Sequence, residues 1–308
     1  WAERPDYTPT PQQVERGLTD QSGRVRLVWT ERLDYTPTPE QIKRGLTDED
    51  VRVRRAWAKR PDYVPTPEQI KRGLTDEHVW VRKAWAERQD YTPSLEHIDI
   101  GLNDPDEQVR LLWAVRQNYT PAPAQIERGL TDPDEMVREA WAKRQDYTPT
   151  QKQIERGLTD GCALVRLAWA RRRDFKPTNE QVARGLADNA CRVRAQWASR
   201  TDWGPPTPEQ VERGLVDEAS EVCVAWLERM DWGPPTEFEI EISMSHPHWE
   251  VRAALARRAD FVPSPALFEC GLTDSSEEVR RAWQERLKLM AQETHDDLLN
   301  LDQLGSQG

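Results

Sequence analysis

One segment recurs along the whole chain at a fixed interval. Val-Arg is followed by Trp four residues after the Val, and this pattern runs from Val25 to Trp197 with a period of 28 residues. The spacing lengthens to 29 twice, at Trp226 and Leu255, and returns to 28 at Trp283. A repeat this short cannot bury a core of its own, whereas stacked repeats can share one. The repeat therefore predicts one elongated array, although 308 residues would ordinarily suggest about two globular domains.

The composition agrees with a thin structure that has much surface. Hydrophobic residues make up 37% of the chain and charged residues 31%. The net charge of -11 disfavours a general nucleic-acid binder, which usually carries a basic excess, but it leaves room for a local basic stripe. No apolar run approaches the roughly 18 residues of a membrane helix. We therefore expect a protein without a membrane partner.

The four cysteines do not form a close-spaced motif. They occupy different places in the repeat, whereas a disulfide framework would reuse one place. We therefore expect free thiols in a reducing, cytoplasmic compartment. The cysteines are Cys162, Cys191, Cys223 and Cys270.

The sequence opens at Trp1, within a repeat and without Met, so we also expect a fragment or a processed chain.

The first half of each repeat begins like a capped helix. In the segment Thr38 to Gln41, Thr is the cap, Pro suits the first helical position and Gln completes a capping box. Ile42 and Leu46 then share one face of the helix. Gly45 would weaken an isolated helix by roughly 1 kcal/mol. Its recurrence in nearly every repeat predicts an offsetting gain, namely close approach by a neighbouring helix or by a bulky Trp.

The second half of each repeat follows an acidic cap, as from Asp132 to Glu135, where Pro and the acids suit the positive end of a helix. Val137, Ala140 and Trp141 form its buried stripe. An Asp-Tyr-Thr-Pro linker then ends the helix. We predict an all-α, right-handed α-solenoid of about ten two-helix repeats over residues 1–289, followed by an acidic tail, 290–308.

One repeat departs from the pattern. The stretch from Thr236 to His248 lacks both the Gly-Leu pair and the capping Asp, and His246 stands in place of that Asp. This irregularity predicts that the array bends or softens at this point.

These motifs resemble two related families of helical repeat. The run from Asp132 to Ala140 resembles the second helix of HEAT-like repeats. The order Val-Arg-x-x-Trp-Ala, Thr-Pro, Ile-x-x-Gly-Leu and Asp is similar to the bacterial leucine-rich variant (LRV) repeat, which alternates an α-helix with a 3₁₀ helix. The present repeat has a longer period, carries Trp where that family has a smaller apolar residue, and lacks the cysteine cluster of its iron–sulfur representative. The resemblance therefore implies the architecture and no cofactor, and such families mostly bind other macromolecules.

One arginine is constant in every repeat, in the sequence Trp-Ala-x-Arg and its variants. A spine of arginines could bind phosphates, or each arginine could pair with an Asp or with helix carbonyls between repeats. We favour this second interpretation, a ladder, because a residue kept in every repeat serves what every repeat needs, which is stacking. The same argument assigns the Trp series and Tyr35 to the core. The arginines are Arg4, Arg32, Arg60, Arg88, Arg116, Arg144, Arg172, Arg200, Arg229, Arg258 and Arg286.

The variable positions of the second helix carry the candidate site. Positions one before, two after and six after the Val lie on one helical stripe, and in solenoids of this kind the second helix usually lines the concave surface. We expect its Leu, Val and Met residues to be exposed, since exposed apolar patches mark contacts. The alternative is that they pack between repeats. The partner-binding candidates are Arg24, Arg52, Arg55, Lys59, Trp80, Lys83, Gln108, Leu111, Val115, Met136, Leu164 and Leu167.

Catalytic motifs are absent from the sequence: it contains no phosphate loop, no Gly-x-Ser-x-Gly and no His-Glu-x-x-His. His246 and His248 could hold a metal ion together with Cys270, but we do not favour this interpretation. We predict a non-catalytic scaffold that binds a protein or peptide, with no metal, cofactor or small-molecule substrate.

Two alternatives remain for the function. The basic first repeats could bind nucleic acid. A third reading, an enzyme like the DNA glycosylases that share HEAT-like repeats, would use Trp80 with Arg52 and Lys83. It is the least favoured, because the acidic last repeats would repel the same duplex.

Overall fold

The structure is a computed structural model that describes the backbone of residues 8–305 and the side chains of residues 8–292. Within that range the chain forms twenty α-helices and no strand, so the predicted all-α solenoid is confirmed. The handedness of the solenoid stays a prediction.

Each repeat contributes a first and a second helix. The first helices are α1 (Pro11–Leu18), α3 (Pro39–Gly45), α5 (Pro67–Leu74), α7 (Leu95–Leu102), α9 (Pro123–Leu130), α11 (Gln151–Leu158), α13 (Asn179–Leu186), α15 (Pro208–Leu215), α17 (Glu237–Met244) and α19 (Pro265–Leu272). The second helices are α2 (Gly23–Glu31), α4 (Val51–Lys59), α6 (Val79–Glu87), α8 (Glu107–Val115), α10 (Glu135–Lys143), α12 (Ala163–Arg171), α14 (Cys191–Ala198), α16 (Ser220–Leu227), α18 (Trp249–Arg257) and α20 (Glu277–Gly305). Both helices of a repeat are α-helical in the described part of the chain, unlike the LRV pattern.

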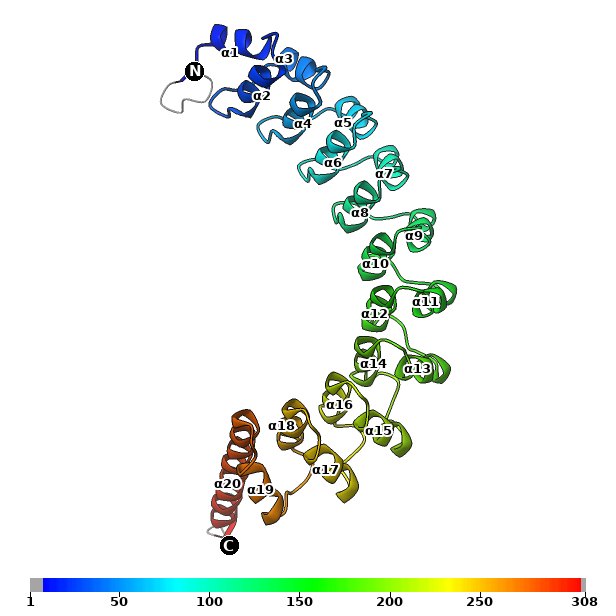
Figure 1. The fold of residues 1–308 in the computed structure, drawn as a ribbon, viewed down its shortest axis with the longest axis vertical. Coiled ribbons are helices and arrows are strands. Elements are labelled where there is room, and N and C mark those ends of the chain that lie inside the picture. The colour runs from blue at the N-terminus through cyan, green and yellow to red at the C-terminus, as the bar shows by residue number, and fades with distance from the viewer. Residues whose placement is uncertain (1–7, 306–308) are drawn as a thin grey trace. The chain divides into compact units, whose positions relative to one another are not determined.

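The helices group into two compact units, residues 1–148 and residues 149–308, which are described separately. In each unit the first helix of a repeat packs on its second helix, and the second helices stack on one another. Figure 1 shows the result within each unit: even-numbered helices form one row and odd-numbered helices the other. The predicted single array over 1–289 stays a prediction. The last helix, α20, continues beyond Leu289 to Gly305, through most of the expected acidic tail.

In every described repeat except α17–α18, the core is a Trp of the second helix that packs against a Gly of the first helix. Trp113 is fully buried, and a Cβ atom added to Gly101 would lie 2.0 Å from its indole nitrogen. The same close approach links Gly45 to Trp57 and Gly214 to Trp226. The predicted reason for the recurring Gly is therefore confirmed: only a residue without a side chain lets the ring lie against the helix.

The predicted caps are also present. Thr66 Oγ1 accepts from the Gln69 amide at 3.3 Å, and the Thr66 amide donates to Gln69 Oε1 at 2.9 Å. In the second helix α10, one Asp134 oxygen accepts from the amides of Met136 and Val137. These local hydrogen bonds set where each helix begins, and hence which residues face the core.

Candidate recognition surface

The arginine of each Val-Arg pair joins neighbouring repeats. The Arg54 guanidinium donates to both carboxylate oxygens of Asp76 in the next repeat, at 2.8 and 3.0 Å, and to the carbonyl of Asp48 at 2.9 Å. This bidentate geometry is the strong form of a charged hydrogen bond. The same arrangement pairs Arg26 with Asp48, Arg82 with Asp104, Arg110 with Asp132, Arg166 with Asp188, Arg194 with Asp217, and Arg252 with Asp274.

The arginine that is constant in every repeat forms a second set of cross-links. Arg144 is buried and donates to the carbonyls of Ala114, Arg116 and Tyr119 in the preceding repeat, at 2.6 to 3.2 Å. Its guanidinium carbon lies 4.7 Å from the centre of the Tyr119 ring. Burial raises the pKa of Tyr119 to about 12, even though the positive charge of Arg144 opposes that rise. The ladder interpretation is confirmed for constant arginines that, like Arg144, donate their guanidinium hydrogens to carbonyls of the preceding repeat. Arg4 lies outside the described residues.

One cross-link between repeats has a different chemistry. Cys223 stands at the position of the Val-Arg arginine, and His246 stands where the next repeat would carry its Asp. The Cys223 sulfur is buried, lies 3.8 Å from His246 Nε2 and donates to the Asp217 carbonyl at 3.3 Å. Burial raises the pKa of this thiol to about 11. The α16–α18 contact therefore lacks the ion pair that other repeats use.

The candidate stripe is exposed at most of its predicted apolar positions. Trp80, Val115, Met136 and Leu164 are 47–51% exposed. Leu111 is half-buried. These side chains cover the solvent-facing side of α6, α8, α10 and α12.

The prediction was wrong for Leu167, which is only 6% exposed. Its position, two after the Val, borders the neighbouring second helix. Lys83 at the same position of α6 shows this, since its Nζ lies 3.1 Å from Asp106 of the next repeat. An apolar side chain at this position folds against the neighbour, so Leu167 is removed from the candidate surface.

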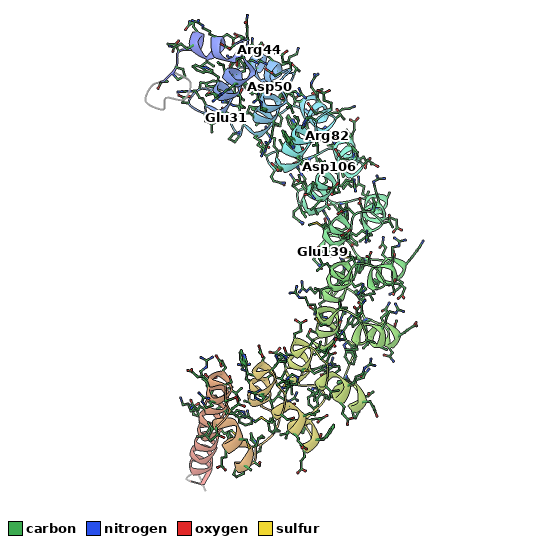
Figure 2. The ribbon with its side chains drawn as sticks, in the orientation of Figure 1. Glu31, Arg44, Asp50, Arg82, Asp106 and Glu139 are labelled. Atoms are coloured by element: carbon green, nitrogen blue, oxygen red, sulfur yellow. The ribbon has the colours of Figure 1, made fainter. Side chains whose placement is uncertain are left out.

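The basic candidates are largely matched by acids. Arg52 pairs with Asp50 at 2.7 Å, and Lys59 pairs with Glu87 at 3.1 Å. Figure 2 shows Glu31 and Glu139 along the row of second helices of the N-terminal unit, and Glu139 accepts from Lys143 at 2.6 Å. Surface charge on this face is therefore mostly paired.

Arg24 and Arg55 keep their charge free on the same face. Both are exposed, and neither forms an ion pair with any residue whose side chain the structure describes. Gln108 is also exposed, on α8.

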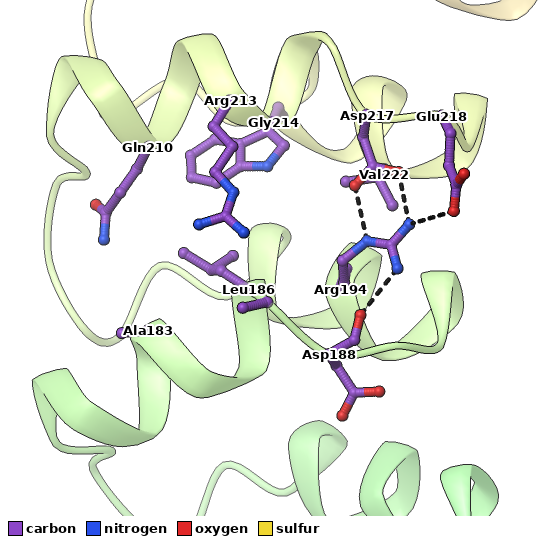
Figure 3. A pocket seen from close by; sticks show the side chains of 12 residues that line it. Ala183, Leu186, Asp188, Arg194, Gln210, Arg213, Gly214, Asp217, Glu218 and Val222 are labelled. Carbon is purple, nitrogen blue, oxygen red and sulfur yellow. Dashed lines mark hydrogen bonds and ion pairs between the residues drawn. The ribbon is translucent and has the colours of Figure 1, made fainter.

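A cavity that the sequence interpretation missed lies in the C-terminal unit. It has a volume of about 530 Å³ and is lined by residues of the α13–α14 and α15–α16 repeats, among them Ala183, Leu186, Gln210, Arg213 and Trp226. Figure 3 shows the Arg213 side chain reaching into it. The sequence does hold a signal for this site, namely Ala183 at a position where several other repeats carry an acid.

The structure does not bring His246, His248 and Cys270 together as a group of metal ligands. Between residues 8 and 292, no group of three or more His, Cys, Asp or Glu side chains is placed to hold an ion. His246 instead contacts Cys223. In the same part of the chain, no helix has the length and apolar character needed to cross a bilayer.

Comparison with known proteins found a short match to a family model and similarity to a solved structure. The model of a HEAT repeat associated with sister chromatid cohesion matches residues 40–56, which run from α3 into α4. A solved structure described as a leucine-rich repeat variant with a novel repetitive structural motif is similar over 72% of this chain and 87% of its own, with a TM-score of 0.49 and 22% sequence identity. No curated protein matches the sequence. The repeats are HEAT-like and LRV-like, as the sequence motifs predicted.

Proposed function

We propose that this solenoid is a scaffold that binds a peptide segment of a partner protein on the second-helix face of its N-terminal unit. The observation that carries the proposal is the exposure of Trp80, Val115 and Met136 on α6, α8 and α10, the second helices of three consecutive repeats. Stacking does not require apolar side chains there, because Arg52 and Lys59 occupy the corresponding places in α4. Apolar groups left in water on adjoining helices are typical of a contact surface.

The charges beside these residues define the chemistry of the partner. Arg24 and Arg55, which form no ion pair with the described side chains, lie on α2 and α4, next in the stack to the helices that carry the apolar residues. A peptide with apolar side chains at one end and acidic side chains at the other would match both parts. The apolar contacts would supply about 1–2 kcal/mol each, and the arginines would set orientation and association rate.

Nucleic-acid binding draws less support from the same face. Phosphate binding requires cations that are free to replace counterions. Arg52, Lys59 and Lys83 each already contact a carboxylate, at 2.7 to 3.1 Å. Duplex DNA or RNA binding with a steep salt dependence would favour this alternative over peptide binding.

A peptide library displayed on phage and selected against the full chain would test the proposal. The best peptide would be measured by fluorescence anisotropy against Trp80→Ala, Val115→Ser and Met136→Ser. We expect each substitution to weaken binding by about tenfold and to leave the melting temperature nearly unchanged, because these side chains are exposed.

The matched controls are Val64→Ser and Val262→Ser, which change exposed valines outside the helices. These controls should bind like the unchanged chain. Unaltered affinity in all three variants of the face would refute the assignment.

A further inference from the structure

At two places in the described chain, an acid on one first helix accepts hydrogen bonds from two side chains of the next first helix. Glu155 of α11 accepts from Gln181 Nε2 of α13 at 3.1 Å and also from the Arg184 guanidinium. Glu15 of α1 accepts in the same way from Gln41, at 3.0 Å, and from Arg44. Hydrogen bonds from Gln181 and Arg184 lower the pKa of Glu155, so the acid is ionised near neutral pH.

The groove between α13 and α15 keeps the two donors but lacks the acid. Gln210 and Arg213 of α15 correspond to Gln181 and Arg184, whereas Ala183 of α13 stands at the place of Glu155. Arg213 forms no hydrogen bond or ion pair with the described side chains, and the Gln210 amide nitrogen has no acceptor among them either. The result is an arginine and an amide donor that border an open cavity of about 530 Å³ (Figure 3).

The acids that line this cavity are already committed to other arginines. Asp217 receives two hydrogen bonds from Arg194, both at 2.7 Å, and Figure 3 shows these contacts apart from the Arg213 guanidinium. Burial would raise the pKa of Asp217, but the hydrogen bonds from Arg194 and the Ala219 amide lower it overall. Asp188 is held in the same way by Arg166. The charge of Arg213 also lowers the pKa of Asp217, but Arg213 donates no hydrogen bond to it, so Arg213 is the lining cation without a hydrogen-bonded carboxylate.

The remaining lining distinguishes this groove from another that also borders an arginine. Leu186, Val222 and Trp226 contribute apolar surface beside Arg213. The cavity at Arg72 in the N-terminal unit is lined by Thr, Asp, Glu and Arg only, and Lys43 stands at its acid position. The groove at Arg213 thus combines a cation that has no hydrogen-bonded carboxylate with an apolar wall.

We propose that the α13–α15 groove binds the carboxylate of a glutamate or aspartate side chain from an acidic peptide, in the place that Glu155 fills one repeat earlier. The guanidinium of Arg213 and the amide of Gln210 donate to its two oxygens, and the apolar wall takes a hydrophobic neighbour in the peptide. This site lies in the C-terminal unit, among first helices, and does not depend on the surface proposed above.

Binding of a defined probe to the full chain tests the proposal. The probe is a blocked tripeptide with glutamate between two leucines, and the readout is the Arg213 Nε–H signal in the NMR spectrum, assigned with Arg213→Gln. We expect a saturable shift of that signal. Blocked glutamate alone should bind more weakly, because it lacks the apolar neighbours, and inorganic phosphate should give no comparable shift.

Two substitutions supply opposite controls. Ala183→Glu restores the acid on an exposed helix position, so it should abolish probe binding and raise the melting temperature. Glu155→Ala should create a second site of the same kind at Arg184, whose signal would then respond to the probe. Circular dichroism checks that both variants fold.

The assignment fails if the tripeptide produces no saturable shift, if Ala183→Glu binds it as well as the unchanged chain, or if phosphate binds equally. Failure at this site would leave binding at Trp80, Val115 and Met136 unaffected, so the two proposals are judged separately.

Discussion

The α7–α8 repeat and the α17–α18 repeat solve the same packing problem with different residues. In the first, Gly101 lies against Trp113; in the second, Ser243 and Leu255 hold those two places, and both are fully buried. Leu is smaller than Trp and leaves room for the Ser side chain, whose hydroxyl donates to the Glu239 carbonyl at 2.6 Å. The two positions differ together because the space for one is set by the size of the other.

The cross-links around these two repeats differ in a parallel way. Arg110 of α8 donates to both oxygens of Asp132, at 2.8 and 2.9 Å. The corresponding pair between α16 and α18 is Cys223 with His246, at 3.8 Å. The contact between α16 and α18 therefore relies on apolar packing, whereas the contact between α8 and α10 adds an ion pair. Matching substitutions in the two repeats, compared by the stability that each one costs, test the predicted softening at the irregular repeat.

The largest effect is expected from removing the core ring. Trp113→Ala should destabilise the N-terminal unit by about 3–5 kcal/mol, as is usual for a buried aromatic. The Trp113 indole nitrogen has no hydrogen-bond partner among the described residues, so the substitution removes packing and the contact with the Arg116 guanidinium, whose carbon lies 5.0 Å from the ring centre. Leu255→Ala should cost less, about 2–3 kcal/mol.

Hydrogen exchange would show where each loss falls. Because repeats are held by their nearest neighbours, protection should drop in adjoining repeats and spare distant ones. A uniform loss along the chain would contradict the array.

Breaking a cross-link comes next. Arg110→Ala should destabilise the fold by about 3 kcal/mol, because it leaves the Asp132 carboxylate buried without its partner. Cys223→Ala should cost only about 1 kcal/mol, since it removes a small buried group with one weak contact. Urea unfolding of both variants measures the difference.

The double variant Arg110→Ala with Asp132→Ala serves as the control. It should recover part of the loss, since the stranded charge is gone. If Arg110→Ala and Cys223→Ala lowered the free energy of unfolding equally, the ion pair would add no stability.

Substitutions at the first-helix position compare the Gly101–Trp113 pair with the Ser243–Leu255 pair more finely. Gly101→Ala should destabilise by about 1–3 kcal/mol through overpacking against Trp113. Gly161→Ala is the matched control, because a Cβ atom there meets nothing within 4 Å. Ser243→Ala should cost about 1 kcal/mol, the value of one hydrogen bond. Thermal unfolding ranks the three, and a neutral Gly101→Ala would disprove the close fit.

The smallest effect is a dependence on pH that only the irregular cross-link should show. Burial lowers the pKa of His246 from its usual 6.5, so the folded protein favours the neutral ring. Stability from this residue is complete above pH 6.5 and is lost as pH falls through the lower, folded-state pKa.

The regular cross-links respond only in more acidic solution. The hydrogen bond from Arg252 lowers the pKa of Asp274 below 3.8, so that pair persists until far lower pH. Hydrogen exchange compared at pH 7 and pH 5 should therefore show α16–α18 opening first. His246→Gln should remove this difference, and an unchanged pH response in that variant would assign it to another group.

The sequence alone determined the features that arise within about one helical turn or one repeat. The capping box of Thr66 and Gln69 and the Gly–Trp packing follow from local hydrogen bonding and from helical period, which one repeat already contains. The interpretation of the constant arginines as a ladder rested on the same regularity.

Only the tertiary structure decided which side chains are buried and which charges are paired, because these features depend on residues 22 to 29 positions away, in the adjacent repeat. Leu164 is exposed and Leu167 is buried, although both lie on the same helical stripe, because only the stacked second helix determines which side of α12 is covered. The pairing of Lys59 with Glu87 and the missing acid opposite Arg213 belong to the same class. Helical period predicts which way a side chain points within its own helix, whereas burial and charge pairing depend on what the next repeat places opposite it.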